Sequence, residues 1–281
     1  MRRITKKLIE KFERYLAEEE KSAATSEKYM RDIRKFKKWI EKKDIDKPAV
    51  LEYKRFLEEN YAPSSVNSML SSINSFFEFN EWYCCKLKTL KIQKRTFAED
   101  ERELTRCEYE RLLKAAKNNE NKRLYYLMQT ICSTGIRVSE LKFITVEAVQ
   151  TKQAVINCKG KIRVILLQNS LCKILSQYIK ERNIKKGSVF QTRSGRPLNR
   201  TNIWADMKKL CKMSGVSEKK VFPHNLRHLF ARTYYSLQKD IVRLADILGH
   251  SNINTTRIYT MESGSVHRKH MQKIGQILLK T

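Results

Sequence analysis

Glycine and proline are scarce in this sequence, which has 8 and 4 of them among 281 residues. Because these residues interrupt helices and form tight turns, their scarcity favours a helical protein over a β-sandwich or barrel. No apolar run approaches about 18 residues, so we expect no membrane-spanning helix. The N-terminus, MRRITKKLIEKFERYL, is charged throughout and does not resemble a signal peptide.

Several motifs of common enzyme chemistry are missing. The sequence has no P-loop, no G-x-G-x-x-G and no carboxylate cluster with the spacing of a metal site. Its seven cysteines form no C-x-x-C pair, and their odd number does not suggest a disulfide framework. We expect reduced, mostly buried thiols in a cytosolic protein.

Acidic residues are greatly outnumbered by basic ones. The 58 Lys and Arg against 30 Asp and Glu give a net charge of +28. Residues 1–100 hold 23 basic and 17 acidic residues, whereas residues 101–281 hold 35 and 13. The C-terminal part is therefore the more electropositive. Because the cations are spread along the chain, they favour a broad polyanionic partner, nucleic acid above all, over a basic surface without a specific partner.

Residues 1–87 have the periodicity of a small helical module. Apolar residues recur at helical spacing over 4–20 and again over 21–43, where Thr25 or Ser26 is the expected N-cap. Two further helices are expected, each beginning after a proline. Four short helices in succession are typical of a compact helical domain.

The polar face of the helix expected over 21–43 is strongly basic. We predict that its cations contact DNA, because Lys and Arg gathered on one helix face suit phosphates. The predicted contacts are Lys28, Arg31, Lys35 and Lys38.

Residues 88–104 have weak periodicity and dense charge, which predicts an interdomain linker. Thr105 then caps a new helix, with Glu108 at the capping-box position. The segment 153–168 has two β-rich arms around the turn CKGK and predicts an antiparallel hairpin. Helical patterns follow to the end. The expected fold class is mainly α, with a small antiparallel β-sheet in a C-terminal domain over 105–281.

Two motifs of this domain hold polar residues that do not suit a core. In TGIRVSEL, Arg137 follows a Thr-Gly turn, and Glu140 can hold its guanidinium across one turn. A surface ion pair is the simpler alternative. In PHNLRH, His224 and Arg227 share one helix face, where they could bind a phosphate or merely end a basic helix in solvent.

Three more residues complete the set. A lysine in a β-turn such as Lys159 is normally solvated, but it could donate a proton if the hairpin reached into a groove. Gly249 ends a helix, and His250 follows as a helix-end histidine or as part of a site. Tyr259 lies among small polar residues and is a possible nucleophile. Such a set of cations could stabilise phosphoryl transfer without a metal.

The order of TGIRVSEL, the hairpin lysine, HNLRH and LGHSNINTTRIYT resembles the tyrosine recombinase (phage integrase) family. It is most similar to the short Xer-type or transposon-encoded members. The resemblance runs from about residue 5 to the end, because TSEKYMRDIRKFKKWI and SSVNSMLSSINSFFEF are similar to the family's core-binding domain. It implies a two-domain, C-shaped DNA clamp, with a SAM-like core-binding domain over 1–87 and a catalytic domain over 105–281.

The resemblance implies a role for most of these candidates. Tyr259 would attack the scissile phosphate and form a 3′-phosphotyrosine link. Arg137 and Arg227 would hold the non-bridging oxygens. His224 would assist proton transfer from the tyrosine, and His250 would hydrogen-bond the phosphate. Because the bond energy is kept in the protein–DNA ester, the resemblance implies neither ATP nor a metal, and no cofactor of any kind.

The hairpin lysine would protonate the leaving 5′ oxygen as the general acid, and Glu140 would orient the first arginine. The family often shows K-G-x-K-x-R-x-x-P here, but this run is one residue shorter and lacks the proline. Lys159 is our choice for the general acid, and Lys161 is the alternative.

The tail 266–281 has an apolar stripe on a basic helix. It could pack on its own domain, but the resemblance suggests that it docks on a neighbouring protomer, giving a homo-tetramer on two DNA duplexes. The expected partner is a double-stranded recombination site with inverted half-sites, in the cytoplasm at the nucleoid. The sequence leaves open whether the enzyme integrates and excises, resolves or inverts DNA.

Two other function classes are weaker. A DNA-binding regulator without chemistry would fit the charge and the helices, but it need not keep the two arginines, two histidines, lysine and tyrosine together. A type IB topoisomerase or a telomere resolvase shares the phosphotyrosine chemistry, but the recombinase-like N-terminal helices argue against both.

Overall fold

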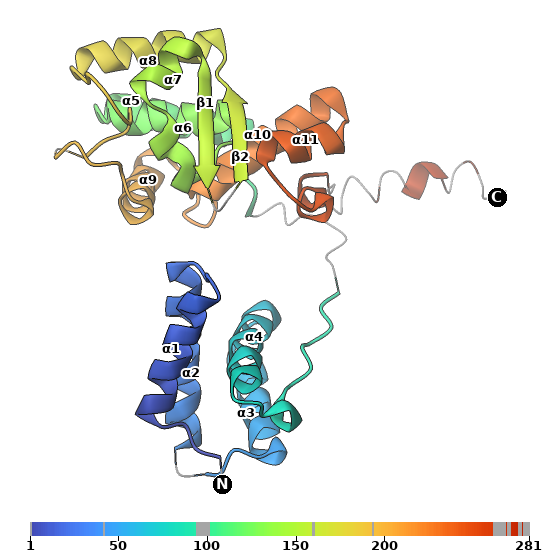
Figure 1. The fold of residues 1–281 in the computed structure, drawn as a ribbon. Helices are drawn as coiled ribbons and strands as arrows, with labels where there is room; N and C mark the ends of the chain where they lie inside the picture. The colour runs from blue at the N-terminus through green and yellow to red at the C-terminus, as the bar shows by residue number, and fades with distance from the viewer. Residues whose placement is uncertain are drawn as a thin grey trace. The chain divides into compact units, whose positions relative to one another are not determined.

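The computed structural model describes residues 2–41, 43–93, 102–158, 161–192 and 194–260, together with 268, 271–274 and 277. It divides into two compact units, Met1–Lys94 and Arg95–Thr281 (Figure 1). The limits of the linker over 88–104 stay a prediction. The C-terminal helix predicted over 266–281 lies largely outside the described residues.

The N-terminal unit contains α1 (Lys6–Glu18), α2 (Ala23–Ile40), α3 (Lys47–Asn60) and α4 (Pro63–Phe79). The cap of α2 is Ser22, whose hydroxyl accepts the backbone N–H of Thr25 at 3.3 Å. The prediction of Thr25 or Ser26 as this cap was therefore wrong. Ser22 fits the role because its backbone is still extended while its oxygen already faces the first turn.

Aromatic side chains form the core of this unit. Phe12, Phe36, Phe76 and Phe77 are fully buried. The rings of Phe12 and Phe76 meet edge to face with centroids 5.1 Å apart, which suits the quadrupoles of two aromatic rings. The helical module predicted from the periodicity is thus confirmed.

Two asparagines on α4 hold the chain that leaves the unit. The side-chain amide of Asn74 accepts the N–H of Leu87 and donates to its carbonyl, both at 2.8 Å. Asn67 makes the same pair of bonds with Leu90, at 2.7 and 2.9 Å. Each asparagine side chain therefore satisfies both backbone groups of one residue, as a neighbouring β-strand would. The first residues of the predicted linker run along α4 in this way.

The C-terminal unit contains α5 (Arg106–Asn118), α6 (Lys122–Thr134), the 3₁₀ helix η3 (Val138–Phe143), α7 (Val146–Thr151), α8 (Asn169–Glu181), α9 (Arg200–Ser214), α10 (Pro223–Gln238) and α11 (Ile241–Leu248). The capping box of Thr105 and Glu108 is present, as predicted. Neither α6 nor α7 was predicted from the sequence. Helix α6 contacts α5, α8 and α10, so apolar residues on several of its sides blur the helical period.

The predicted hairpin is confirmed as β1 (Gln153–Cys158) and β2 (Lys161–Leu166), paired antiparallel (Figure 1). Its inner face packs on the core through Ala154, Ile156 and Ile165. On β2 the outward residues alternate with these, and Val164 is exposed. Arg163 pairs with Ile156 in the register and therefore belongs to the inner face.

Six cysteines fall in the described part with their side chains, and all six are free thiols. Cys85, Cys172 and Cys211 are buried, whereas Cys84 and Cys107 are exposed, so burial holds for half of the six. Over the described residues, no helix is long and apolar enough to cross a membrane.

Candidate active site

The turn TGIR positions the first arginine. Gly135 ends α6 in the left-handed region at φ +64°, and a Cβ there would lie 2.4 Å from the Phe230 ring. Only glycine suits both the backbone and the contact. The chain then reverses, and Arg137 becomes the N-cap residue of η3.

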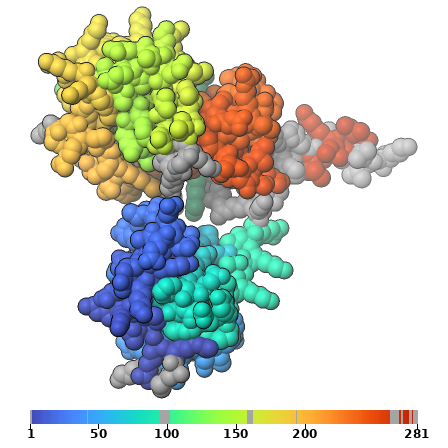
Figure 2. Space-filling view, in the orientation of Figure 1, coloured from blue at the N-terminus to red at the C-terminus, as the bar shows by residue number. Residues whose placement is uncertain are grey.

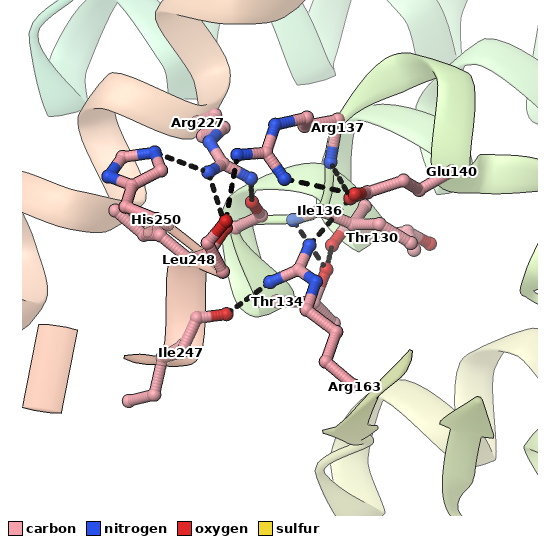
Figure 3. Close-up of polar contacts among 12 residues, drawn as sticks. Thr130, Thr134, Ile136, Arg137, Glu140, Arg163, Arg227, Ile247, Leu248 and His250 are labelled. Atoms are coloured by element: carbon pink, nitrogen blue, oxygen red, sulfur yellow. Dashed lines mark hydrogen bonds and ion pairs between the residues drawn. The ribbon is translucent and has the colours of Figure 1, made fainter. Parts of the chain in front are cut away.

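Glu140 holds Arg137 in two ways, as the spacing predicted. Its carboxylate accepts the backbone N–H of Arg137 at 2.8 Å and Nη1 of the same residue at 3.0 Å (Figure 3). It also accepts Nη2 of Arg163 at 2.6 Å. Burial would raise the pKa of this carboxyl, but the Arg137 N–H and the two guanidinium groups outweigh burial and lower it. Glu140 therefore stays ionised at neutral pH.

Among the described residues, Arg227 is the least exposed cation, with 1% of its surface exposed. Its guanidinium donates to the carbonyls of Gly135 at 2.6 Å and Leu248 at 2.8 Å, and Nη2 lies 2.9 Å from Nε2 of His250 (Figure 3). Its Nε has no hydrogen-bond partner among the described residues. Burial and then the charge of Arg137 lower its pKa to about 10, so it remains a cation at pH 7.

His250 has a defined tautomer. A guanidinium can only donate, so Nε2 of His250 must accept the bond from Arg227. Nδ1 then carries the proton and donates to the hydroxyl of Thr256 at 2.8 Å, and Thr256 is fully buried. Burial and the neighbouring guanidinium groups of Arg227 and Arg137 lower the pKa of His250 to about 4, which agrees with a neutral ring.

The predicted nucleophile lies in this cluster, but not in the surroundings that the sequence suggested. Tyr259, on the short helix η5 (Arg257–Tyr259), is 3% exposed and packs with apolar residues of α10 and α11. Its ring meets His228 edge to face at 4.6 Å and stacks at 6.1 Å with His250. Burial lowers the pKa of the Arg227 guanidinium, and the neighbouring Tyr259 hydroxyl, which can accept a hydrogen bond from it, acts in the opposite direction.

A pocket of about 310 Å³ opens beside these residues. Arg137, His224 and Arg227 line it, together with Arg200 and Trp204 of α9. Withdrawal from water and the charges of Arg227 and Arg137 lower the pKa of His224. Arg227 belongs both to this pocket and to the cluster around Tyr259. The pocket therefore presents cations and a neutral imidazole to an anion of phosphate size.

The structure thus brings Arg137, Glu140, His224, Arg227, His250 and Tyr259 together. Lys159 lies outside the described residues, and of Lys161 only the backbone, at the first position of β2, is described.

Arg163, His228 and Thr256 were not predicted from the sequence. A cation on an otherwise apolar strand and the second histidine of PHNLRH were the available signals for the first two. Thr256, in an ordinary polar turn, gave none.

The four cations predicted to contact DNA differ in their surroundings. The Lys28 ammonium donates to Asp32 at 2.7 Å and to Ser68 O and Ser72 Oγ at 2.8 Å. Lys35 donates to the Tyr61 hydroxyl and lies 4.2 Å from that ring's centroid. Arg31 and Lys38 are exposed.

Comparison with known proteins places both units in one class. Residues 102–264 match the Phage integrase family, and residues 9–83 match the Phage integrase N-terminal SAM-like domain. A helical SAM-like domain followed by a catalytic domain with this site defines a tyrosine recombinase. The chain belongs to the phage integrase family, and it is a site-specific recombinase that cuts and rejoins DNA.

Curated relatives match along nearly the whole chain. The tyrosine recombinase XerD of Xanthomonas axonopodis pv. citri is 28% identical over 299 residues, covering 95% of this chain and 95% of that protein. The tyrosine recombinase XerA of Thermococcus kodakarensis is 29% identical, covering 95% and 94%. The chain is therefore Xer-like over both units.

Solved structures share the fold. The XerH recombinase bound to its difH substrate in a pre-cleavage complex has a TM-score of 0.71 at 18% identity, covering 99% of this chain and 85% of that one. A lambda integrase dimer bound to a COC′ core site has a TM-score of 0.75 at 17% identity, covering 92% and 96%. At these identities the likeness concerns the fold alone.

Proposed function

We propose that Tyr259 is the nucleophile of strand cleavage. Its hydroxyl attacks the scissile phosphate, a 3′-phosphotyrosine bond forms, and the bond to the 5′ oxygen breaks. The observation that carries this proposal is the burial of the Tyr259 ring beside Arg227, which lines the same pocket as Arg137. A phosphate bound by that guanidinium would lie beside the attacking oxygen.

Arg137 and Arg227 are proposed to hold the two non-bridging oxygens. Both line the 310 Å³ pocket, and Arg227 is oriented in advance by the carbonyls of Gly135 and Leu248. Glu140 keeps Arg137 in place while 38% of the arginine side chain stays exposed. Donors fixed before the reaction stabilise the pentacovalent charge without reorganising, which is the role that a metal ion has in other phosphoryl-transfer enzymes. The proposal needs neither a metal nor ATP.

Proton transfer is proposed to involve the two histidines. His224 is neutral at pH 7 because its pKa is lowered, so it can accept the tyrosine proton. His250 now accepts a bond from Arg227. A phosphate that draws this guanidinium to itself would release Nε2, and its negative charge would favour a protonated ring that donates to the oxygen.

The general acid is proposed to be Lys159, with Lys161 as the alternative. In the sequence, Lys159 lies between β1, which ends at Cys158, and β2, which begins at Lys161.

The proposed substrate is a double-stranded recombination site with inverted half-sites, exchanged through a four-way junction by a homo-tetramer. One solved relative is a lambda integrase tetramer bound to a Holliday junction. The segment 266–281 is proposed to join neighbouring protomers, and Arg31 and Lys38 are the exposed members of the predicted DNA face. Lys28 and Lys35 belong to the same predicted set, but their ammonium groups already donate to Asp32 and to Tyr61, so Arg31 and Lys38 are proposed to carry the contact. The enzyme is proposed to act in the cytoplasm at the nucleoid.

The test begins with duplexes selected from random sequence by their binding to the Tyr259→Phe protein. On a nicked form of the selected duplex, the unaltered protein should form a covalent adduct in buffer containing EDTA, and Tyr259→Phe should bind equally but form none. An adduct of undiminished yield with Tyr259→Phe, or cleavage that needs magnesium, would contradict the proposal.

A further inference from the structure

Arg163 links the hairpin to two parts of the site that are distant in sequence. From β2 its guanidinium donates to Oε2 of Glu140 at 2.6 Å and to the carbonyl of Ile247 near the end of α11 (Figure 3). Only 16% of the side chain is exposed. In the space-filling view, the yellow-green surface of the hairpin adjoins the orange surface of α11 (Figure 2).

Gly249 leaves room for the Arg163 side chain because it has no Cβ. It ends α11 at φ +63°, and a Cβ there would lie 2.7 Å from Cδ and 2.9 Å from Nε of Arg163. The arginine stem therefore lies directly on the glycine backbone. The carbonyl of the same glycine accepts Nη2 of Arg137 at 3.3 Å, and the next residue is His250. The glycine that the sequence marks as a helix cap thus also admits the arginine.

Each contact of Arg163 lies next to a residue proposed to bind the phosphate. Glu140 also accepts from Arg137, and Ile247 precedes Leu248, whose carbonyl accepts from Arg227. Gly249 precedes His250. Apolar packing alone would hold the inner face of β2, which Ile165 already anchors. Burying the Arg163 cation costs desolvation free energy, and its Nε has no partner among the described residues, so it is a poor means of simply attaching the strand to the core. Its directional hydrogen bonds to Glu140 and Ile247 suit a role in positioning better.

We propose that Arg163 is a positioning residue that fixes the register of the β1–β2 hairpin against Glu140 and the end of α11. β2 begins at Lys161, two residues before Arg163, and the proposed general acid precedes it in the sequence, so we expect this clamp to set where the hairpin lysine meets the leaving oxygen. The inference rests on the proposed function, since it assigns the tip a leaving group to protonate. Arg163 itself does not touch the reacting atoms.

The test separates leaving-group protonation from the rest of the reaction. Arg163→Met and Arg163→Lys are compared on two nicked substrates of the selected sequence, one ordinary and one with sulfur at the 5′-bridging position. On the second, the Tyr259 oxygen bonds to phosphorus and the P–S bond breaks with its electron pair leaving on sulfur. A thiolate is a good enough leaving group to depart without a proton, so a displaced general acid no longer matters.

Both variants should cleave the ordinary substrate about 100-fold more slowly, the typical worth of general-acid catalysis, and the sulfur substrate within a few fold of the unaltered protein. Their affinity for the duplex should stay within about threefold. Hydrogen exchange of the amides over 153–166 should accelerate in both variants before DNA is added, because the clamp is lost. Arg106→Met, at an exposed arginine of α5, is the matched control and should change none of these.

Equal defects on the two substrates would overturn the proposal, because Arg163 would then act on the arginines or the tyrosine. Unchanged cleavage of the ordinary substrate would overturn it too. If Arg163→Met unfolds, Arg163→Lys decides, since lysine keeps the charge but cannot hold two acceptors in one fork. Failure of the unaltered protein to cleave either substrate would instead contradict the proposed function, and the proposal with it.

Discussion

The two units bury charge in opposite ways. In the N-terminal unit, Asp32 is 5% exposed, and its carboxylate accepts both the Lys28 ammonium and the Ser72 hydroxyl at 2.7 Å. The ammonium completes its three bonds with Ser68 O and Ser72 Oγ. Every partner is a side chain or carbonyl of α2 or α4. This network is complete in itself and joins two helices.

In the C-terminal unit, Arg137 and Arg163 both pair with Glu140, and among the described residues of the unit no carboxylate pairs with Arg227. Main-chain carbonyls accept further bonds from all three guanidinium groups, and His250, which accepts one from Arg227, is kept neutral. This cluster lacks negative charge, and a phosphodiester would supply it. A satisfied buried network stabilises a fold, whereas a buried group of uncompensated charges is a candidate ligand site.

The largest effect should come from removing a cation of the unbalanced cluster. Arg227→Lys keeps the charge but loses the fork that reaches Gly135, Leu248 and His250 together. We expect single-turnover cleavage to fall about 1000-fold, the order found for preorganised donors at a developing charge. Quench-flow or gel assays on the selected nicked duplex measure it. Cleavage within tenfold of the unaltered rate would mean that the imbalance does not serve the phosphate.

The balanced network should instead control stability. Asp32→Ala leaves the Lys28 ammonium without its counter-charge and should lower the free energy of unfolding by about 2–3 kcal/mol, with cleavage by the folded protein unchanged. Urea denaturation of the full chain measures it. Asp44→Ala, at an exposed ion pair with Arg3, is the matched control and should cost under about 0.5 kcal/mol. If both variants lost the same free energy of unfolding, the buried Asp32 network would not stabilise its unit more than an exposed ion pair does, and the contrast between the two units would not hold.

Mild acid should destabilise the unbalanced cluster selectively. The pKa values of His228 and His250 are lowered to about 4, against about 6.5 in an unfolded chain. Below pH 6.5 the unfolded chain binds more protons, so stability is full above that pH and is lost as the pH falls toward 4. Allowing for partial exposure, we expect a loss of about 1–2 kcal/mol between pH 6.5 and 5.

Urea denaturation at half-unit pH steps tests this slope. His250→Asn should reduce the slope, because asparagine keeps polar contacts but does not titrate in this range. A stability that stays flat from pH 6.5 to 5 in the unaltered protein would show that the histidines are not held neutral by the cluster.

The fold was largely predictable because helical period, prolines and caps are local signals. The capping box of Thr105 and Glu108 and the hairpin around CKGK are confirmed, since each is fixed by residues close in sequence. Helix α6 was missed because neighbours on several sides decide its burial, and no single apolar stripe shows it. Which residue caps α2 depends on where the chain enters the helix, and several nearby hydroxyls were equally good candidates.

From the sequence, the motifs pointed to residues that lie together in the structure, but not to the contacts between them. The motifs named Arg137, Glu140, His224, Arg227, His250 and Tyr259, which the structure brings together. They did not show that Tyr259 is buried against His228, or that Arg163 reaches Glu140, because these contacts join segments that are distant in the chain. On α2 likewise, the helical spacing predicted the same role for Lys28 and Lys38. They differ only because α4 packs against Lys28, whose ammonium donates to Ser72.

That difference gives the smallest expected effect. Lys38 is exposed, so Lys38→Ala should reduce the slope of log affinity against log salt for the selected duplex by about 1, with stability changed by under about 0.5 kcal/mol. Lys28→Ala should leave the slope unchanged, because its three N–H groups already have acceptors, and should instead lower stability. Fluorescence anisotropy from 50 to 300 mM salt measures the slopes. Equal losses of slope would mean that Lys28 exchanges its protein partners for a DNA phosphate. Charge in the N-terminal unit would then be available to phosphate, as we expect for the C-terminal unit.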